Sequence, residues 1–215
     1  MSKLHVFDMD GTLLKGSACL ELSRHLGQLE VILELEEKWS RGELSHFEYW
    51  ELSLPLWEGL DDEIIDRTFA ATAWLSGIEA VWADIARRGE HSAVITQSPQ
   101  FFADRLLPWG VETVRGAEVY VGVPPEPHQV ITPEDKVPIT VELMAGYGVI
   151  STDCVAYGDS LSDYPLFQFL PNTVAVNATP ALRQIAAAAY EGDDLWEAYL
   201  VGRALLDRDG KALKR

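Results

Sequence analysis

The sequence predicts an α/β fold in which a parallel sheet is covered by helices on both faces. From residue 76 onward, short apolar runs alternate with amphipathic helical segments, which is typical of strand–helix–strand units. A purely helical stretch, residues 16–75, separates the first predicted strand from the second and is too long for one crossover. We therefore expect a core built from residues 1–15 and 76–215, with residues 16–75 inserted as a helical cap over the carboxyl edge of the sheet.

The composition indicates a folded chain with one large domain, or a core domain with a small insertion. Of its 215 residues 47% are hydrophobic, and 34 acidic residues against 17 basic ones give a formal net charge of −17. Such a charge excludes binding to nucleic acid or to anionic membranes by general attraction. Any phosphate site in this chain must therefore supply its own local positive charge.

The cysteines and the N-terminus favour a soluble cytoplasmic protein. Cys19 and Cys154 are the only cysteines and stand among apolar residues, so we expect two buried thiols and no disulfide framework. The N-terminus lacks the basic start and long apolar run that are typical of a signal peptide. No apolar stretch approaches the length of a membrane span. The sequence does not indicate an oligomeric state.

The first third of the chain predicts one strand followed by helices. The strand is residues 4–7, LHVF. Ser45 and Glu48 form a capping box at a helix start, and Pro55 should kink or end that helix. Acidic residues 61–63 mark another start, where negative charge suits the helix dipole. The expected buried faces consist of Phe47, Trp50, Leu54, Trp57, Ile64, Ile65, Thr68, Phe69 and Thr72.

Helices and strands alternate in the rest of the chain. We expect strands over residues 91–96, within 111–121, over 154–158 and over 173–176. We expect helices over residues 77–88, 99–107, 134–147, 161–170, 181–189 and 194–206. The run GVPPEP, from residue 122, indicates a surface loop.

Two aspartates follow the first predicted strand. Asp8 and Asp10 stand two residues apart in VFDMDGTLL, and Gly11 allows a turn that brings Asp10 back toward the same pocket. An ordinary Asp-Gly turn explains this motif when it is taken alone. Two carboxylates in one place are nevertheless unfavourable unless a cation or a catalytic task requires them.

Three further features fall at a strand end or a helix start. Thr96 ends the second strand, Lys136 lies near the start of the helix expected over residues 134–147, and the motif GDSLSD, residues 158–163, follows a later strand. Taken singly, they could be a helix cap, a solvated lysine and a polar turn. Lys136 fits that explanation least well, because a cation at a helix start opposes the helix dipole. Such a local conflict often marks a functional position.

Together these residues predict a phosphate-transfer site. Asp8 offers a carboxylate oxygen as the nucleophile toward phosphorus. Asp10 can protonate the departing alkoxide and later deprotonate the attacking water. Thr96 donates a hydroxyl hydrogen bond to the phosphoryl group, Gly11 lies in the same phosphate-binding turn, and Lys136 pairs with the phosphoryl group and with Asp8.

The same site predicts a bound Mg²⁺ ion, because carboxylate and carbonyl oxygens are the ligands this cation prefers. We expect Asp8, Asp159 and a backbone carbonyl near Asp10 to hold it. Asp163, together with Ser162, is expected to support the metal waters or Lys136 from behind.

This set resembles the haloacid dehalogenase superfamily of phosphohydrolases. Its four motifs appear in order, as DMDGT at residues 8–12, Thr96, Lys136 and GDSLSD at 158–163, and the resemblance covers nearly the whole chain. The helical insertion after the first motif is similar to the small cap of the phosphoserine-phosphatase-like branch (subfamily IB). The resemblance implies a Rossmann-like core with strand order 3-2-1-4-5, in which the strands before Asp8 and Asp159 are neighbours.

The positions that would contact substrate depart from that branch. Its members carry a glutamate that binds the substrate amine where this chain has Ser17, and a cap arginine that binds the substrate carboxylate where it has Ser53. Their second motif is a serine followed by two glycines rather than residues 96–98, TQS, and Ser162 replaces an asparagine. Phosphoserine is therefore disfavoured as the substrate.

Other residues of the predicted cap offer weaker indications of the substrate. Arg24 and Arg41 are candidate anion contacts, although exposed arginines are mostly solvated. Four tryptophans indicate either an apolar or ring-bearing leaving group or ordinary core packing: Trp39, Trp50, Trp57 and Trp74.

The sequence thus predicts a Mg²⁺-dependent phosphomonoesterase acting on a small phosphorylated metabolite through phospho-Asp8. Asp10 argues against carbon–halogen cleavage, which needs no protonated leaving group. Phosphoryl transfer to an acceptor other than water uses the same residues and stays open. A phosphate-responsive switch similar to receiver domains also combines an aspartate, a threonine and a lysine, but the long cap and Asp10 count against it.

Overall fold

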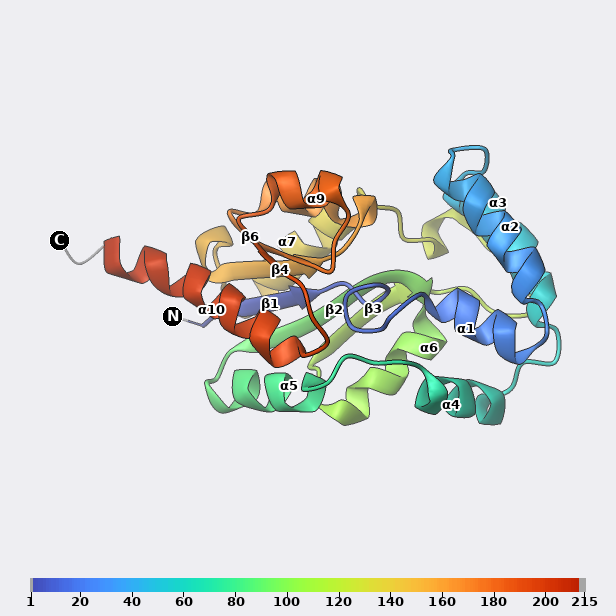
Figure 1. The fold of residues 1–215 in the computed structure, drawn as a ribbon, viewed down its shortest axis with the longest axis horizontal. Helices are drawn as coiled ribbons and strands as arrows, with labels where there is room; N and C mark the ends of the chain where they lie inside the picture. Colours follow the sequence, from blue (N-terminus) through green and yellow to red (C-terminus); the bar gives the residue numbers. More distant parts are fainter. Residues whose placement is uncertain (1, 213–215) are drawn as a thin grey trace.

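The centre of the molecule is a parallel sheet, seen in a computed structural model that describes residues 2–212 (Figure 1). The strands are β1 (Leu4–Phe7), β2 (His91–Pro99), β3 (Thr113–Ala117), β4 (Cys154–Gly158), β5 (Asn172–Val176) and β6 (Ala188–Tyr190). Their order is β3-β2-β1-β4-β5-β6. The predicted order 3-2-1-4-5 is confirmed, and β6 extends it by one edge strand.

Helices connect and cover these strands. Those between β1 and β2 are α1 (Ala18–His25), α2 (Leu29–Ser40), α3 (His46–Ser53), α4 (Asp62–Ala71) and α5 (Ile78–Arg87). Those after β2 are α6 (Gln100–Ala103), α7 (Lys136–Tyr147), α8 (Tyr164–Phe169), α9 (Pro180–Ile185) and α10 (Leu195–Ala212). The predicted capping box at α3 is confirmed, since the Ser45 hydroxyl accepts from the Glu48 amide while the Glu48 carboxylate accepts from the Ser45 amide. Pro55 ends α3 in a 3-10 turn, Leu54–Trp57, as expected.

The two faces of the sheet bury separate apolar clusters, because successive side chains along β1 point to opposite faces. Leu4 and Val6 pack on one face with residues of α7, α8 and α9. Phe7 points to the other face, where it stacks on Tyr157 at a centroid distance of 4.4 Å and joins residues of α5 and α10. Figure 1 shows α7 and α9 on one side of the sheet and α5 and α10 on the other. The predicted covering of both faces is therefore confirmed.

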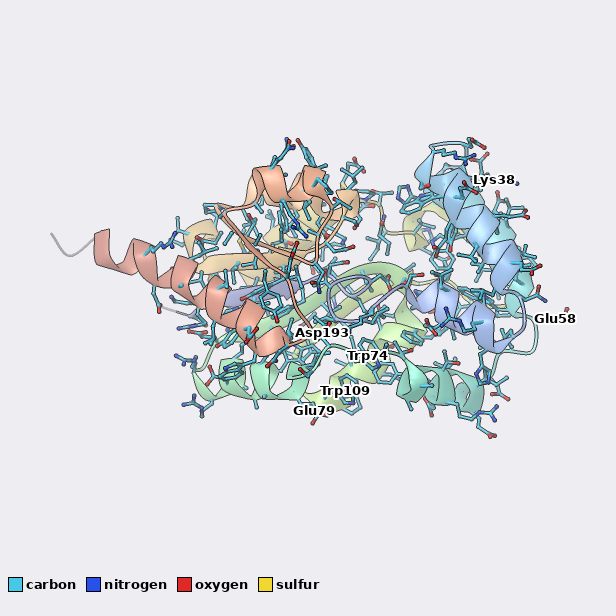
Figure 2. All side chains as sticks on the ribbon, in the orientation of Figure 1. Lys38, Glu58, Trp74, Glu79, Trp109 and Asp193 are labelled. Atoms are coloured by element: carbon cyan, nitrogen blue, oxygen red, sulfur yellow. The ribbon has the colours of Figure 1, made fainter. Side chains whose placement is uncertain are left out.

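Helices α1–α4, called the inserted helices below, gather at one end of the molecule beyond the carboxyl end of β1 (Figure 1). Lys38 and Glu58 mark their outer surface in Figure 2. The chain enters and leaves this region side by side: the Lys15 amide donates to the Ala73 carbonyl at 2.9 Å, and the Leu75 amide donates to the Leu13 carbonyl at 2.8 Å. The division of the chain into a core and a cap at residues 15 and 76 stays a prediction, which this paired crossing supports.

The expected helix over residues 181–189 was wrong in its second half. Helix α9 ends at Ile185, and Ala188–Tyr190 pairs in parallel with β5 as β6. Alanine is intrinsically a strong helix former, so the local sequence favoured a helix. The free edge of β5 provides backbone partners, and the Ala187 amide also donates to the Thr173 hydroxyl at 2.9 Å. Tertiary pairing thus outweighs propensity here.

A second difference concerns the end of β2. This strand runs to Pro99 instead of stopping at Thr96, and its pairing with β3 shifts register between Ile95 and Pro99. Proline is tolerated in a sheet at such irregularities. The expected helix over residues 99–107 is consequently short, and α6 passes into a 3-10 turn over Asp104–Trp109.

The tryptophans of the first third divide between core and cavity. Trp57 is fully buried, and its Nε1 donates to the Ser23 hydroxyl at 2.8 Å. Trp74 packs against Phe69 and Trp109 at centroid distances of 4.7 and 5.3 Å, and Figure 2 shows the latter pair close together. Both tryptophans therefore stabilise the packing and do not line the cavity described below.

Two expectations about the whole chain also have structural counterparts. Cys19 and Cys154 are both buried free thiols, as predicted. Between residues 2 and 212, no helix combines the length and the apolar content needed to cross a membrane.

Candidate active site

The predicted site residues meet at the carboxyl edge of the sheet, around β1 and β4. These strands are neighbours, and their last paired residues are Phe7 and Tyr157. Asp8 and Asp159 follow these two residues closely and therefore lie at the same edge of the sheet. The Asp8 amide continues the ladder by donating to the Tyr157 carbonyl at 2.9 Å. Because β1 lies between β2 and β4, the chain changes winding direction here, and such switch points form ligand crevices in open α/β sheets.

Lys136, the first residue of α7, supplies the positive charge of this edge. Its Nζ donates to Asp8 Oδ1 and to Asp163 Oδ1, each at 2.7 Å, and lies 3.4 Å from the Ser162 hydroxyl. Burial alone would lower the pKa of Lys136, which is 1% exposed, but the carboxylates of Asp163 and Asp8 raise it above its usual value. The lysine is therefore charged, and its conflict with the helix dipole is resolved by two buried carboxylates.

Three carboxylates cluster around this lysine. Single oxygens of Asp8, Asp159 and Asp163 lie within 4.8 Å of one another. Burial, together with the neighbouring carboxylates, raises the pKa of Asp8 well above its usual range despite Lys136. Burial and the charge of Asp163 raise the pKa of Asp159 to about 7. The protein alone thus leaves more negative charge here than Lys136 can balance.

A divalent cation fits this donor set. Asp159 Oδ1 is buried and has no hydrogen-bond partner among the described residues. Both Asp163 oxygens are already engaged, Oδ1 by Lys136 and Oδ2 by the Asp159 amide at 3.0 Å. Asp163 therefore orients Lys136 and the loop after β4, while Asp8 and Asp159 have the carboxylate oxygens that would suit a hard cation such as Mg²⁺. The full ligand set, with a carbonyl near Asp10, stays a prediction.

Asp10 is held apart from that cluster and faces the inserted helices. Its Oδ1 accepts from the Ala18 amide at 2.8 Å, and its Oδ2 accepts from the Ser98 hydroxyl at 2.6 Å and the Thr96 hydroxyl at 3.3 Å. Burial raises the pKa of Asp10, and these hydrogen bonds oppose the rise. A carboxyl group with a raised pKa suits general acid chemistry.

Ser98 is a site residue that the sequence did not predict. Its side chain lines the cavity next to Asp10, whereas Thr96 is fully buried and its hydroxyl turns to Asp10 and the Ser98 amide. The contact between Thr96 and a phosphoryl group stays a prediction. Positions 96 and 98 lie on the same face of an extended strand, so a second hydroxyl two residues after Thr96 was the available signal.

A cavity of about 410 Å³ joins these carboxylates to the inserted helices. The inserted helices and the loop before them contribute Gly16, Ser17, Cys19, Glu36, Trp39, His46, Tyr49 and Trp50 to its wall. Ser17 caps α1 and also donates its hydroxyl hydrogen to Glu36 Oε1 at 2.9 Å. The sequence did not single out Glu36, because its approach to Ser17 depends on the packing of α1 on α2.

The candidate anion contacts of the predicted cap lie elsewhere. Arg24 pairs with Glu21 at 2.7 Å and Arg41 pairs with Glu37, and more than half of each arginine side chain is exposed. Ser53, the position aligned with a cap arginine, is buried and donates its hydroxyl to the Tyr49 carbonyl at 2.6 Å. These three side chains are not among the residues that line the cavity.

The arrangement agrees with comparisons to known proteins. Residues 5–168 match the family described as haloacid dehalogenase-like hydrolase. The chain belongs to this family. It is 25% identical over 198 residues to the phosphoserine phosphatase of Archaeoglobus fulgidus, covering 90% of this chain but only 58% of that protein.

Solved structures share the fold of this chain. A substrate-bound complex of phosphoserine phosphatase aligns with a TM-score of 0.78 at 21% identity, covering 92% of this chain and 96% of the other. A phospho-aspartyl intermediate analogue of phosphoserine phosphatase aligns with a TM-score of 0.77 at 22% identity, covering 91% and 96%. The chain is therefore similar in sequence and in fold to proteins of the phosphoserine-phosphatase-like branch, as the motifs indicated.

The lack of a side chain at Gly11 leaves room for the Asp159 carboxylate, so Gly11→Ala should weaken the predicted metal binding. Gly11 has φ +76°, and a Cβ there would overlap the Asp159 carboxylate. Displacing this carboxylate should raise the Mg²⁺ concentration for half-maximal activity roughly 10–100-fold, the usual cost of disturbing a metal site's surroundings. A magnesium titration of phosphate release measures the shift.

Gly59→Ala is the matched control for this substitution. Gly59 has a similar φ of +86°, but its added Cβ would meet no described atom within 4 Å. Both variants carry backbone strain, whereas only Gly11→Ala disturbs Asp159. Equal magnesium titrations for the two variants would contradict the assignment of Asp159.

Proposed function

We propose that this protein is a Mg²⁺-dependent phosphomonoesterase that hydrolyses a small organic phosphate through phospho-Asp8. The observation that carries the proposal is the buried contact of Lys136 Nζ with Asp8 Oδ1 at 2.7 Å, beside the Asp159 oxygen that no residue from 2 to 212 hydrogen-bonds. The lysine provides the local positive charge that a phosphate needs in so acidic a protein. The phosphoserine phosphatases that it resembles support the same chemistry.

The first half of the reaction forms the phosphoenzyme. An oxygen of Asp8 attacks phosphorus, and the bond between phosphorus and the leaving alkoxide breaks. Lys136 stabilises the negative charge of the phosphoryl oxygens. Asp10 donates a proton to the leaving oxygen, so that a neutral alcohol departs. When bound by Asp8 and Asp159, Mg²⁺ would neutralise charge on the phosphoryl group.

The second half releases phosphate. Asp10, now ionised, accepts a proton from a water molecule that attacks phosphorus, and the bond from phosphorus to Asp8 breaks. Ser98 and the Ala18 amide hold the Asp10 carboxylate on the cavity side throughout. The products are inorganic phosphate and the regenerated Asp8 carboxylate.

Removal of the divalent metal should abolish phosphate release, since Lys136 alone does not balance the three carboxylates. The measurement is phosphate release from a panel of phosphate monoesters with Mg²⁺, after EDTA treatment, and after Mg²⁺ is returned. We expect loss with EDTA and recovery with Mg²⁺. Full activity in EDTA would contradict the metal assignment, and no release from any ester would contradict the proposed function.

Phosphoserine, as one ester of the panel, and an added alcohol carry additional information. Rapid turnover of phosphoserine would contradict the interpretation of Ser17 and Ser53. An added alcohol acceptor would reveal transfer to a molecule other than water as a phosphorylated product in place of inorganic phosphate.

A further inference from the structure

The cavity places the leaving group of a substrate against the inserted helices. Asp8 and Asp10 line the same cavity as Glu36, Trp39 and Tyr49, so an ester whose phosphorus lies at Asp8 must direct its organic part toward those side chains. Their chemistry should therefore determine which organic part is accepted. This step rests on the proposed function, because it takes Asp8 as the nucleophile.

Aromatic rings form much of this end of the cavity, and they face different directions. The rings of Trp39 and Tyr49 lie 6.1 Å apart with an interplanar angle of 49°, and those of Tyr49 and Trp50 lie 5.6 Å apart at 78°. Rings set at steep angles present faces from more than one side. The negatively charged face of an aromatic ring attracts cations, and several such faces around one space are typical of sites for ammonium groups.

A carboxylate completes this part of the wall. Glu36 enters from α2 and is half-buried, with its Oε1 held by the Ser17 hydroxyl at 2.9 Å. Burial, aided by the nearby charge of Asp10, raises the pKa of Glu36 to about 7, although the Ser17 and Tyr49 hydroxyls oppose the rise. A bound cation would offset both the burial and the repulsion from Asp10.

An anionic leaving group finds no positive charge here, because burial lowers the pKa of His46, which also lines the cavity, and keeps its ring neutral at pH 7. Within residues 2–212, no lysine or arginine lines the cavity, and Lys136 is engaged beneath Asp8. A substrate carboxylate would also meet Glu36 at close range. A neutral aromatic leaving group would suit the rings but would bring no positive charge to Glu36, whose hydrogen-bond partner Ser17 is neutral.

We infer that the substrate is a phosphomonoester whose alcohol carries a small cationic group, a primary or quaternary ammonium, held between Glu36 and the rings of Trp39, Tyr49 and Trp50. The phosphate and the ammonium group then occupy opposite ends of one cavity. The cavity volume of about 410 Å³ is at the small end for ligand sites and suits an alcohol of a few carbon atoms. The acidic surface of the protein would favour the approach of the cationic end.

The test compares two esters that differ only in charge. Phosphocholine carries a quaternary nitrogen where 3,3-dimethylbutyl phosphate carries a carbon atom, and the two have nearly the same shape. We expect kcat/KM to be at least about tenfold higher for phosphocholine than for the neutral ester, the effect of a partly desolvated ion pair and ring faces. The difference should appear mainly in KM.

Glu36→Gln and Trp39→Leu should reduce this preference. Glutamine keeps the shape of Glu36 and its contact with Ser17 but loses the charge, so the ratio of the two kcat/KM values should fall toward one. Glu37→Gln is the matched control, since Glu37 neighbours Glu36 on α2 but is exposed and pairs with Arg41. This control should keep the wild-type ratio. Both kcat/KM values of a ratio come from the same variant, so a smaller fraction of folded protein lowers both values equally and leaves the ratio unchanged.

The possible outcomes separate this inference from the proposed function. Mg²⁺-dependent and Asp8-dependent release from both esters at equal kcat/KM would overturn the inference alone. A ratio that Glu36→Gln and Glu37→Gln lower equally would also overturn it. Release from no ester of the panel would overturn the proposed function, and the inference would fall with it.

Discussion

Asp8→Asn should abolish phosphate release while leaving the fold intact. The amide is nearly isosteric with the carboxylate, but its nitrogen and neutral oxygen are poor nucleophiles toward phosphorus. We expect a loss on the order of 10⁴-fold or more in kcat, the scale seen when a catalytic nucleophile is removed. Because burial and neighbouring carboxylates raise the pKa of Asp8, neutralising it also relieves repulsion. Phosphate release and thermal denaturation together measure the two effects.

Asp10→Asn provides the companion measurement for the nucleophile. This variant keeps Asp8 and loses the proton donor, so an ester with a leaving group that needs no proton, such as 4-nitrophenyl phosphate, should still phosphorylate the enzyme. We expect a burst of 4-nitrophenol equal to the enzyme concentration and then slow turnover. Asp8→Asn should show no burst. Activity that survives Asp8→Asn would rule out Asp8 as the nucleophile.

Lys136→Met should destabilise the metal-free protein by about 3–5 kcal/mol, the usual effect of removing one partner from a buried charge network. The variant leaves Asp8 and Asp163 buried without their common cation. Lys15→Met is the matched control, because Lys15 pairs with Asp193 at 2.7 Å but its side chain is 50% exposed. Such an exposed pair contributes about 0–1 kcal/mol. Urea denaturation in EDTA compares the two variants.

The pH dependence of stability should show whether the stability lost in Lys136→Met is electrostatic in origin. In the wild type, the folded-state pKa of Lys136 is raised, so its contribution is complete below the usual lysine pKa and decreases only at higher pH. In Lys136→Met the charge that lowers the pKa of Asp8 is gone, so this pKa rises further and the folded variant takes up a proton at a higher pH than the folded wild type. The variant should therefore become more stable relative to the wild type as pH falls from 7 to 5. An unchanged difference across this range would contradict the electrostatic explanation.

The sequence predicted what short local patterns determine. The apolar run before Asp8, the glycine after Asp10 and the order of the four motifs are readable without any partner, and the sheet places their side chains at one edge. The strand β6 could not be read in the same way, because residues 186–189 are all alanine and only the open edge of β5 makes this segment extended.

The substrate end of the site depended on tertiary packing in a similar way. Helical periodicity treats Trp50 and Trp57 alike, yet Trp50 lines the cavity while Trp57 is fully buried against Ser23. Glu36 stands 19 residues after Ser17, and only the packing of α2 on α1 brings them together. Local patterns therefore indicated the chemistry, while the packing of helices determined which side chains face the substrate.

The paired crossing at Lys15–Ala73 and Leu13–Leu75 has an evolutionary consequence. A segment whose two ends lie side by side can be lengthened, shortened or replaced without moving the strands that bear the reacting groups. One bond limits this freedom, since the Ala18 amide holds Asp10 and any replacement must present a similar donor. Selection could in this way replace the inserted helices while the arrangement of Asp8, Asp159 and Lys136 at the edge of the sheet is kept.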